Sequence, residues 1–151
     1  MTLKARKLRL EGLDEIILER HGDGSALYSE VYDEQLLSDA GIHIKWVQDS
    51  VSLSSSVGTI RGFHFKAPPH SQDKLVPKGF LHGLMTPEPE TEIVYKCSDF
   101  YARECDGSVR FDDPELAIVW PLKGDPILSS KDAATPKMLD FDSPFIYGEN
   151  S

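Results

Sequence analysis

The chain has 151 residues, of which 40% are hydrophobic and 27% are charged, a balance that is typical of a globular protein and excludes wholesale disorder. The formal net charge of −9 disfavours nonspecific attraction to nucleic acid or to an anionic membrane. This length is ordinary for one domain, so we expect residues 1–151 to form a single domain.

No stretch of the sequence has the apolar core of a signal peptide or the length of a membrane span. We therefore expect a cytoplasmic protein that binds neither membrane nor nucleic acid. Cys97 and Cys105 lack the spacing of a metal motif, and we interpret them as reduced thiols.

The first third of the chain predicts short strands and one helix. Residues 7–20 alternate between apolar and polar side chains and then become apolar, which indicates a strand, a bend at Gly12 and a second strand. A short helix is expected over residues 33–40, because Gly41 stands at the position that glycine favours after a helix. Residues 43–55 predict a further strand, with Ile44, Trp46 and Gln48 on one face.

Residues 58–76, GTIRGFHFKAPPHSQDKLV, bring basic side chains together in an otherwise acidic chain. Arg61, Lys66 and Lys74 form a local cluster that could meet an anionic ligand. In the predicted strand Arg61 and His64 fall on opposite faces, so a twist, bulge or difference in depth is needed before both can serve one ligand. Apolar neighbours imply a poorly hydrated His64, whose neutral form could accept a proton. The alternative is a histidine of the packed core.

The second half of the chain turns often. Residues 91–102 predict a strand with Ile93, Tyr95 and Cys97 on one face, and residues 116–120 predict a short buried strand. The tail from residue 123 is expected to be extended surface chain with one turn at residues 128–136. Many short strands with frequent glycine and proline predict an all-β fold, for which we favour a jelly roll (double-stranded β-helix, cupin-like) with one or two short helices.

Five histidines raise the question of a metal site, for which His64, His70 and His82 are the strongest candidates. The strand reads His-Phe-Lys rather than His-x-His, and no glutamate follows at a fitting distance, so we expect no metal. The sequence contains no nucleophile elbow, P-loop or dinucleotide fingerprint.

Three further side chains have both a structural and a chemical interpretation. Asp132 could hold one tautomer of His64 and stabilise its protonated form, although a charged turn residue is normally exposed. Tyr95 and Tyr101 are packing residues in most β-proteins, but a desolvated tyrosine hydroxyl can donate a proton to a carbanion.

Seven blocks between residues 46 and 136 resemble, in order, the dTDP-4-dehydrorhamnose 3,5-epimerase family. They read VQDS, GTIRGFHF, QDKLV, PKGFLHG, YKCSDFYA, DDPELAIVWP and LSSKDAATP. The resemblance implies a jelly roll that works without metal or cofactor on a nucleotide-diphosphate sugar, as a homodimer.

The resemblance also implies a role for each residue of the site. His64 matches the catalytic base, Asp132 the carboxylate that orients it, and Tyr95 the acid on the opposite face of the sugar. Lys74 matches the residue that stabilises the enolate. The implied substrate contacts are Arg61, Gln48, Tyr101, His82 and Lys131.

The expected reaction is epimerisation at C3, C5 or both of a 4-keto-6-deoxy sugar, because the ketone acidifies the neighbouring C–H bonds. The alternatives are a ketoisomerase or single-centre epimerase on the same scaffold, a non-catalytic jelly roll that binds nucleotide sugars, and, last, a metal-dependent cupin.

The sequence departs from the family pattern at three places. Ser25 and Ser50 stand where an arginine and an asparagine are usual, so the nucleotide or the sugar can differ. Between Val76 and Pro77 the family carries a few dozen more residues, enough for several strands. The gap is either a genuine deletion, in a short variant whose sheet edges are covered by a partner chain, or the place of an excised segment that the consecutive numbering has closed up.

Overall fold

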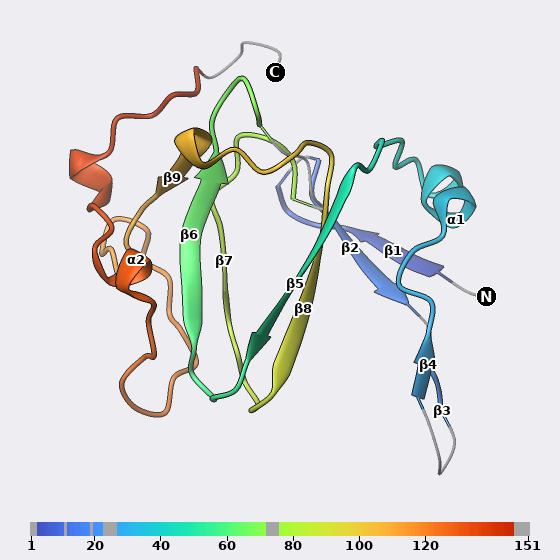
Figure 1. Ribbon diagram of the computed structural model, residues 1–151, viewed down its shortest axis with the longest axis horizontal. Helices are drawn as coiled ribbons and strands as arrows, with labels where there is room; N and C mark the ends of the chain where they lie inside the picture. Colours follow the sequence, from blue (N-terminus) through green and yellow to red (C-terminus); the bar gives the residue numbers. More distant parts are fainter. Residues whose placement is uncertain (1–2, 11, 19, 23–26, 72–75, 147–151) are drawn as a thin grey trace.

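The computed structural model describes residues 3–10, 12–18, 20–22, 27–71 and 76–146, and its ribbon is shown in Figure 1. Lys74 and Ser25 lie outside the described residues. Within these ranges, the helices are too short or too polar for any of them to cross a membrane.

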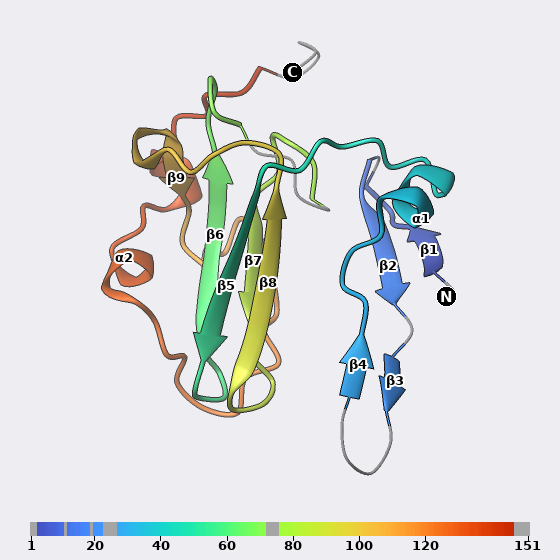
Figure 2. The ribbon, with the colours of Figure 1, turned by 45° about the vertical axis from the view of Figure 1, so that its right-hand side comes forward.

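The N-terminal part consists of two hairpins and a helix, which lie to one side of the main sheets in Figures 1 and 2. Strand β1 (Leu3–Lys7) pairs antiparallel with β2 (Asp14–Leu18), and β3 (Arg20–Gly22) pairs with β4 (Leu27–Ser29). The turn at Gly12 and the strand that follows it are confirmed. The first strand was predicted too late in the chain, because β1 ends at Lys7, where the predicted strand begins.

Helix α1 (Glu34–Asp39) begins and ends at the signals in the sequence. The side chain of Asp33 accepts a hydrogen bond from the Leu36 amide at 3.0 Å, which satisfies one of the free N–H groups of the first turn. Gly41 has a φ of +83°, and its amide bonds to the Ser38 carbonyl at 2.9 Å. The predicted helix is therefore confirmed.

Two antiparallel sheets form the main body. In the first, β5 (Gln48–Ser54) pairs with β8 (Thr91–Cys97). In the second, β6 (Ile60–Lys66) lies between β7 (His82–Met85) and β9 (Asp106–Ser108). The two sheets lie against each other in both ribbon views (Figures 1 and 2).

The predicted strand over residues 43–55 forms only from Gln48 onward. Gln48 pairs with Cys97, which is the last residue of β8. Residues 43–47 therefore have no further part of β8 to pair with. Only the amide of Val47 still reaches across, to the Cys97 carbonyl at 2.9 Å. Ile44 and Trp46 are half-buried in irregular chain.

The C-terminal tail packs on the outer side of the β6 sheet (Figure 1). Phe65 contacts the rings of Phe141 and Phe145, with centroids 5.3 and 5.4 Å apart, and Phe63 lies 5.6 Å from Trp120. Burial of these aromatic rings holds the tail against the sheet. The tail also contains the short helix α2 (Ser130–Ala133), which lies at the turn predicted there, and the 3-10 helix η2 (Met138–Asp140). A further 3-10 helix, η1 (Arg103–Cys105), lies between β8 and β9.

The prediction of a buried strand over residues 116–120 is wrong. The amides of Leu116 and Ala117 bond back to the carbonyls of Asp113 and Pro114, at 3.1 and 3.2 Å, so the chain makes turns instead of joining a sheet. Val119 is 91% exposed. An apolar run of five residues does not by itself indicate which backbone partners are within reach.

Candidate active site

Strand β6 changes face between Arg61 and His64. Arg61 pairs with Leu84 and His64 with His82, so β6 contains one more residue than β7 over this stretch. Such a bulge moves the following side chains to the other face. The bulge that Arg61 and His64 need to share one ligand is therefore present.

Glycine is required where β6 and β7 approach each other at this bulge. A Cβ on Gly62 would lie 2.6 Å from the Cα of Gly83, and Gly62 has a φ of +136°. Only a residue without a side chain fits this approach and this backbone conformation.

A cleft of about 260 Å³ lies between the two sheets. Seven of the residues predicted for the site line it together: Gln48, Arg61, His64, His82, Tyr95, Tyr101 and Lys131. Gln48 and Tyr95 come from the β5–β8 sheet, whereas Arg61, His64 and His82 come from β6 and β7. The strand alternation that places Tyr95 beside Ile93 and Cys97 is confirmed, because these three are less exposed than Glu92 and Val94.

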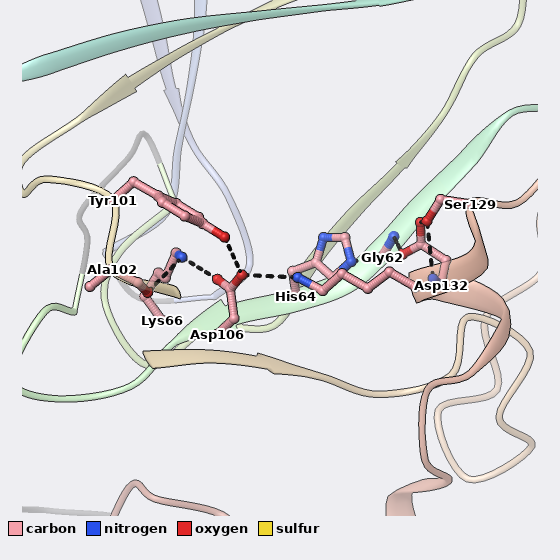
Figure 3. Close-up of polar contacts among 9 residues, drawn as sticks. Gly62, His64, Lys66, Tyr101, Ala102, Asp106, Ser129 and Asp132 are labelled. Atoms are coloured by element: carbon pink, nitrogen blue, oxygen red, sulfur yellow. Dashed lines mark hydrogen bonds and ion pairs between the residues drawn. The ribbon is translucent and has the colours of Figure 1, made fainter. Parts of the chain in front are cut away.

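His64 is bonded to Asp132 across the edge of the cleft. His64 Nε2 lies 2.7 Å from Asp132 Oδ1. Figure 3 shows the imidazole ring beside the carboxylate. The same oxygen accepts the Gly62 amide at 3.2 Å, and Oδ2 accepts the Ser129 hydroxyl at 2.5 Å. Asp132 is buried, so its interpretation as a solvated turn carboxylate is wrong.

Local chemistry explains why residues 128–136 place Asp132 there. Ser129 caps α2, because its Oγ accepts the Asp132 amide at 3.1 Å while its hydroxyl donates to the carboxylate. The hydroxyl of Thr135 donates to the Asp132 carbonyl at 2.8 Å. The turn therefore holds both the backbone and the side chain of Asp132.

The surroundings make His64 neutral and Asp132 ionised near neutral pH. Burial lowers the pKa of His64 below 6.5, and the opposing effect of Asp132 does not fully offset it. Burial alone would raise the pKa of Asp132, but the hydrogen bonds from Ser129 and Gly62, together with His64, lower it. An ionised carboxylate only accepts hydrogen bonds, so Nε2 of His64 carries the proton and Nδ1 is the basic nitrogen.

Arg61 supplies a cation to the same cleft. Its Nη2 donates a long hydrogen bond, 3.4 Å, to the Ser54 hydroxyl. Its Nε is buried and has no hydrogen-bond partner in the described part of the chain. Arg61 lines the cleft, so its positive charge can attract an anionic ligand there.

Comparison with known proteins shows to which family the chain is related. The family model described as dTDP-4-dehydrorhamnose 3,5-epimerase matches residues 7–77 and 75–140. The chain belongs to this family. The enzyme of that name from Sinorhizobium fredii is 30% identical over 167 residues, which cover 85% of this chain and 86% of the relative. The Pseudomonas aeruginosa enzyme is 29% identical over 182 residues, covering 93% and 98%.

Solved structures of epimerases agree with this membership. The dTDP-4-dehydrorhamnose 3,5-epimerase of Bacillus anthracis, solved with TDP and pyrophosphate, has a TM-score of 0.83 at 30% identity and covers 91% of this chain and 100% of that one. The dTDP-6-deoxy-D-glucose-3,5-epimerase of Legionella pneumophila, in complex with dTDP-4-keto-L-rhamnose, has a TM-score of 0.82 at 25% identity, with 93% and 95% covered. The predicted all-β jelly roll with one or two short helices is confirmed.

The match to the family model is divided in two near Val76 and Pro77, where the sequence predicts a missing segment. The two matched parts of the family model meet at residues 75–77. The alignment with the Sinorhizobium enzyme is longer than this whole chain although it uses only 85% of it. The family member from Sinorhizobium therefore has residues that this chain lacks, as the sequence predicted.

The epimerase cleft also contains Lys66, which was expected only as a member of the basic cluster, and Asp106, which was not expected at the site. Lys66 and Asp106 form an ion pair there, and Asp106 also accepts the Lys131 ammonium and the Tyr101 hydroxyl, at 3.0 and 2.9 Å. Lys66 lies two residues after His64, a spacing that places both on one face. No comparable signal exists for Asp106, because it follows a 3-10 turn far along the chain.

The metal hypothesis gains no support in the described ranges of the chain, where no three histidine, cysteine, aspartate or glutamate side chains are grouped to hold an ion. His64 and His82 both line the cleft, but His70 is not among its lining residues and instead lies 3.0 Å from Asp99.

Proposed function

We propose that the chain is an isomerase that epimerises C3, C5 or both of a nucleotide-linked 4-keto-6-deoxy sugar. The observation that carries the proposal is the buried pair of a neutral His64 and an ionised Asp132 beside a cleft that also contains Tyr95. A base and an acid on different sheets suit a reaction that removes a proton from one face of a ring and returns it to the other.

The reaction begins with proton abstraction. Nδ1 of His64 takes the C–H proton next to the C4 ketone, and the electron pair of that bond moves into an enolate. Asp132 stabilises the imidazolium that forms, because it accepts the hydrogen bond that Nε2–H donates and carries a negative charge. The assignment of enolate stabilisation to Lys74 stays a prediction from the family resemblance.

Return of a proton to the opposite face inverts the centre. Tyr95 reaches the cleft from β8, whereas His64 reaches it from β6. The Tyr95 hydroxyl donates its proton to the enolate carbon, and solvent then restores the protonation states of both residues. The product therefore carries a hydrogen from the solvent at the inverted carbon.

The substrate that fits the cleft is a nucleoside diphosphate sugar. The Bacillus and Legionella epimerases were solved with TDP and with a dTDP-linked keto sugar. Here Arg61 and Lys131 provide charge for the diphosphate, and Gln48, Tyr101 and His82 provide contacts for the nucleotide and sugar. The amide of Tyr101 donates to the side chain of Gln48 at 3.0 Å, so these two act together.

The proposal is tested by incubating the protein in deuterated water with a nucleotide-linked 4-keto-6-deoxyhexose and following the C3 and C5 protons by NMR. Deuterium at either position, with an inverted product, is the expected result. Inversion at one centre only supports the single-centre alternative. Absence of exchange, together with thermal stabilisation by the nucleotide sugar, supports a non-catalytic binder instead.

We further propose that two copies of the chain associate through the outer face of the β5–β8 sheet. Gln48, Ser50 and Tyr95 face the cleft, whereas Val51, Leu53 and Val94 on the opposite face are exposed. An apolar face of a two-stranded sheet is unfavourable in water and suits a self-complementary interface. Light scattering should give a dimer for the wild type and a monomer for Val51→Asp, and a monomeric wild type would contradict the proposal.

A further inference from the structure

Lys66 is the most constrained cation of the cleft. Its side chain is 10% exposed, and its ammonium forms an ion pair with Asp106, donates to the Ala102 carbonyl at 3.3 Å and lies 3.8 Å from the centroid of the Tyr101 ring. Figure 3 shows these groups side by side at the end of the cleft away from Asp132. A lysine ammonium that is held by three groups has little conformational freedom left, so it restrains the Asp106 carboxylate and the Tyr101 ring in turn.

The contact with Asp106 changes the charge of the cleft. A carboxylate beside a diphosphate site repels the ligand unless a cation cancels it. Burial alone would raise the pKa of Asp106, but the hydrogen bonds from Lys66, Lys131 and Tyr101 lower it, so Asp106 is ionised. With Lys66 present, its positive charge offsets the negative charge of Asp106, and the positive charges of Lys131 and Arg61 remain to attract the ligand. Without Lys66, the charge of Lys131 would be cancelled by Asp106.

The contact with Tyr101 fixes an aromatic ring. The ammonium covers one face of the ring, and the hydroxyl is tied to Asp106 at 2.9 Å. Tyr101 lines the cleft and is 58% exposed, so its ring remains accessible to a planar or apolar part of a ligand. A ring that is already immobilised loses little conformational entropy when a ligand stacks on it.

We propose that Lys66 is a positioning residue that neutralises Asp106 and immobilises Tyr101, and thereby adapts this end of the cleft to a nucleoside diphosphate. The inference rests on the proposed function, because it names the part of the substrate that this end receives. It assigns Lys66 no part in the proton transfers at His64 and Tyr95.

The chain contains a matched control for this cluster. Lys96 lies 4.3 Å from the centroid of Tyr32 and bonds to both oxygens of Asp49, at 2.7 and 2.8 Å. It therefore has the same kinds of partner as Lys66, but these three residues do not line the cleft. Lys96→Met removes a similar set of contacts without changing the charge of the site.

The experiment measures the affinity for TDP by calorimetry and the steady-state constants of epimerisation. Lys66→Met is expected to weaken TDP binding and to raise KM about tenfold, while kcat falls by less than about threefold. Lys66→Arg retains the charge and should recover most of the affinity, and Lys96→Met should bind TDP as the wild type does. Equal TDP affinity for wild type and Lys66→Met overturns the proposal.

The double variant Lys66→Met with Asp106→Asn separates the neutralisation of Asp106 from the immobilisation of Tyr101. It leaves no unpaired carboxylate in the cleft, so it can be measured even if Lys66→Met does not fold. It should bind TDP about threefold more weakly than the wild type, because the charge is balanced but the ring is no longer held. Equal affinity in the wild type and the double variant overturns the positioning of Tyr101. TDP binding needs no turnover, so a protein without proton exchange would refute the catalytic proposal and leave this test intact.

Discussion

The described part of the chain contains two histidine–aspartate pairs whose separations are similar and whose surroundings differ. His64 and Asp132 are 2.7 Å apart, and His70 and Asp99 are 3.0 Å apart. The side chains of the first pair are 28% and 2% exposed, whereas those of the second are 45% and 32% exposed. Hydrogen-bond distance alone therefore does not identify a catalytic pair.

The difference lies in what the rest of the fold does to each pair. Asp132 is held by Ser129 and the Gly62 amide, and His64 opens on a cleft that also contains Tyr95. His70 and Asp99 are not among the residues that line this cleft. Burial strengthens electrostatic interactions and removes water that would compete for the proton. Only the first pair is placed to act as a base, and the predictions below test that contrast.

Replacing the two histidines should have the largest and most unequal effect. His64→Gln removes the base and should lower the rate of solvent deuterium incorporation about a thousandfold, within the usual contribution of a general base. His70→Gln should stay within about twofold of the wild type, because its exposed ring touches no reacting atom. The measurement is proton exchange by NMR, and similar losses in both variants would contradict the contrast.

The matched pair of aspartate variants should come next. Asp132→Asn keeps the shape of the side chain but removes the charge that stabilises the imidazolium, and kcat should fall about a hundredfold. Asp99→Asn should leave kcat within about twofold, since its charge lies outside the cleft. Circular dichroism and thermal melting confirm that both variants are folded. An Asp132→Asn enzyme with full activity would exclude the proposed pair.

Tyr95→Phe should separate abstraction from inversion. The variant keeps His64 and Asp132, so the substrate should still exchange a proton with solvent, while formation of inverted product should fall about tenfold or more because the opposite face has lost its acid. Chromatography of the products alongside NMR makes the distinction. If exchange and inversion decline together, Tyr95 does not act as a separate acid.

The pH dependence should give the smallest effects, and their signs differ between variants. Protonation of His64 removes the base, so kcat/KM falls at acid pH, with an apparent pKa below 6.5 in the wild type. Asp132 raises the pKa of His64 and Lys131 lowers it. Asp132→Asn should therefore move the acid limb to lower pH, and Lys131→Met should move it to higher pH. His70→Gln should leave the acid limb unchanged. A shift in that variant would mean that the His70–Asp99 pair, and not His64, determines the pH dependence.

Local sequence signals were sufficient for several elements and for most of the cleft. Asp33 and Gly41 bounded a helix because capping depends on neighbours in the chain. The alternation of Ile93, Tyr95 and Cys97 indicated their shared face, because successive side chains of a strand point in opposite directions. Seven family-like blocks in order then identified residues that the fold brings together from distant strands.

Other features depended on which segments meet in space. The turns at residues 114–117, the late start of β5 and the burial of Asp132 follow from the availability of backbone partners, which an apolar or charged run does not encode. Asp106 reaches Lys66 across 40 positions of sequence, and no local pattern anticipates such a contact.

The sequence by itself thus determined the fold class and the family and proposed the candidate site residues, because these depend on local pattern and on the order of motifs. The tertiary structure alone decided which nitrogen of His64 is basic, which charge Lys66 cancels and which of two histidine–aspartate pairs is buried, because these depend on distances between segments that lie far apart in the chain.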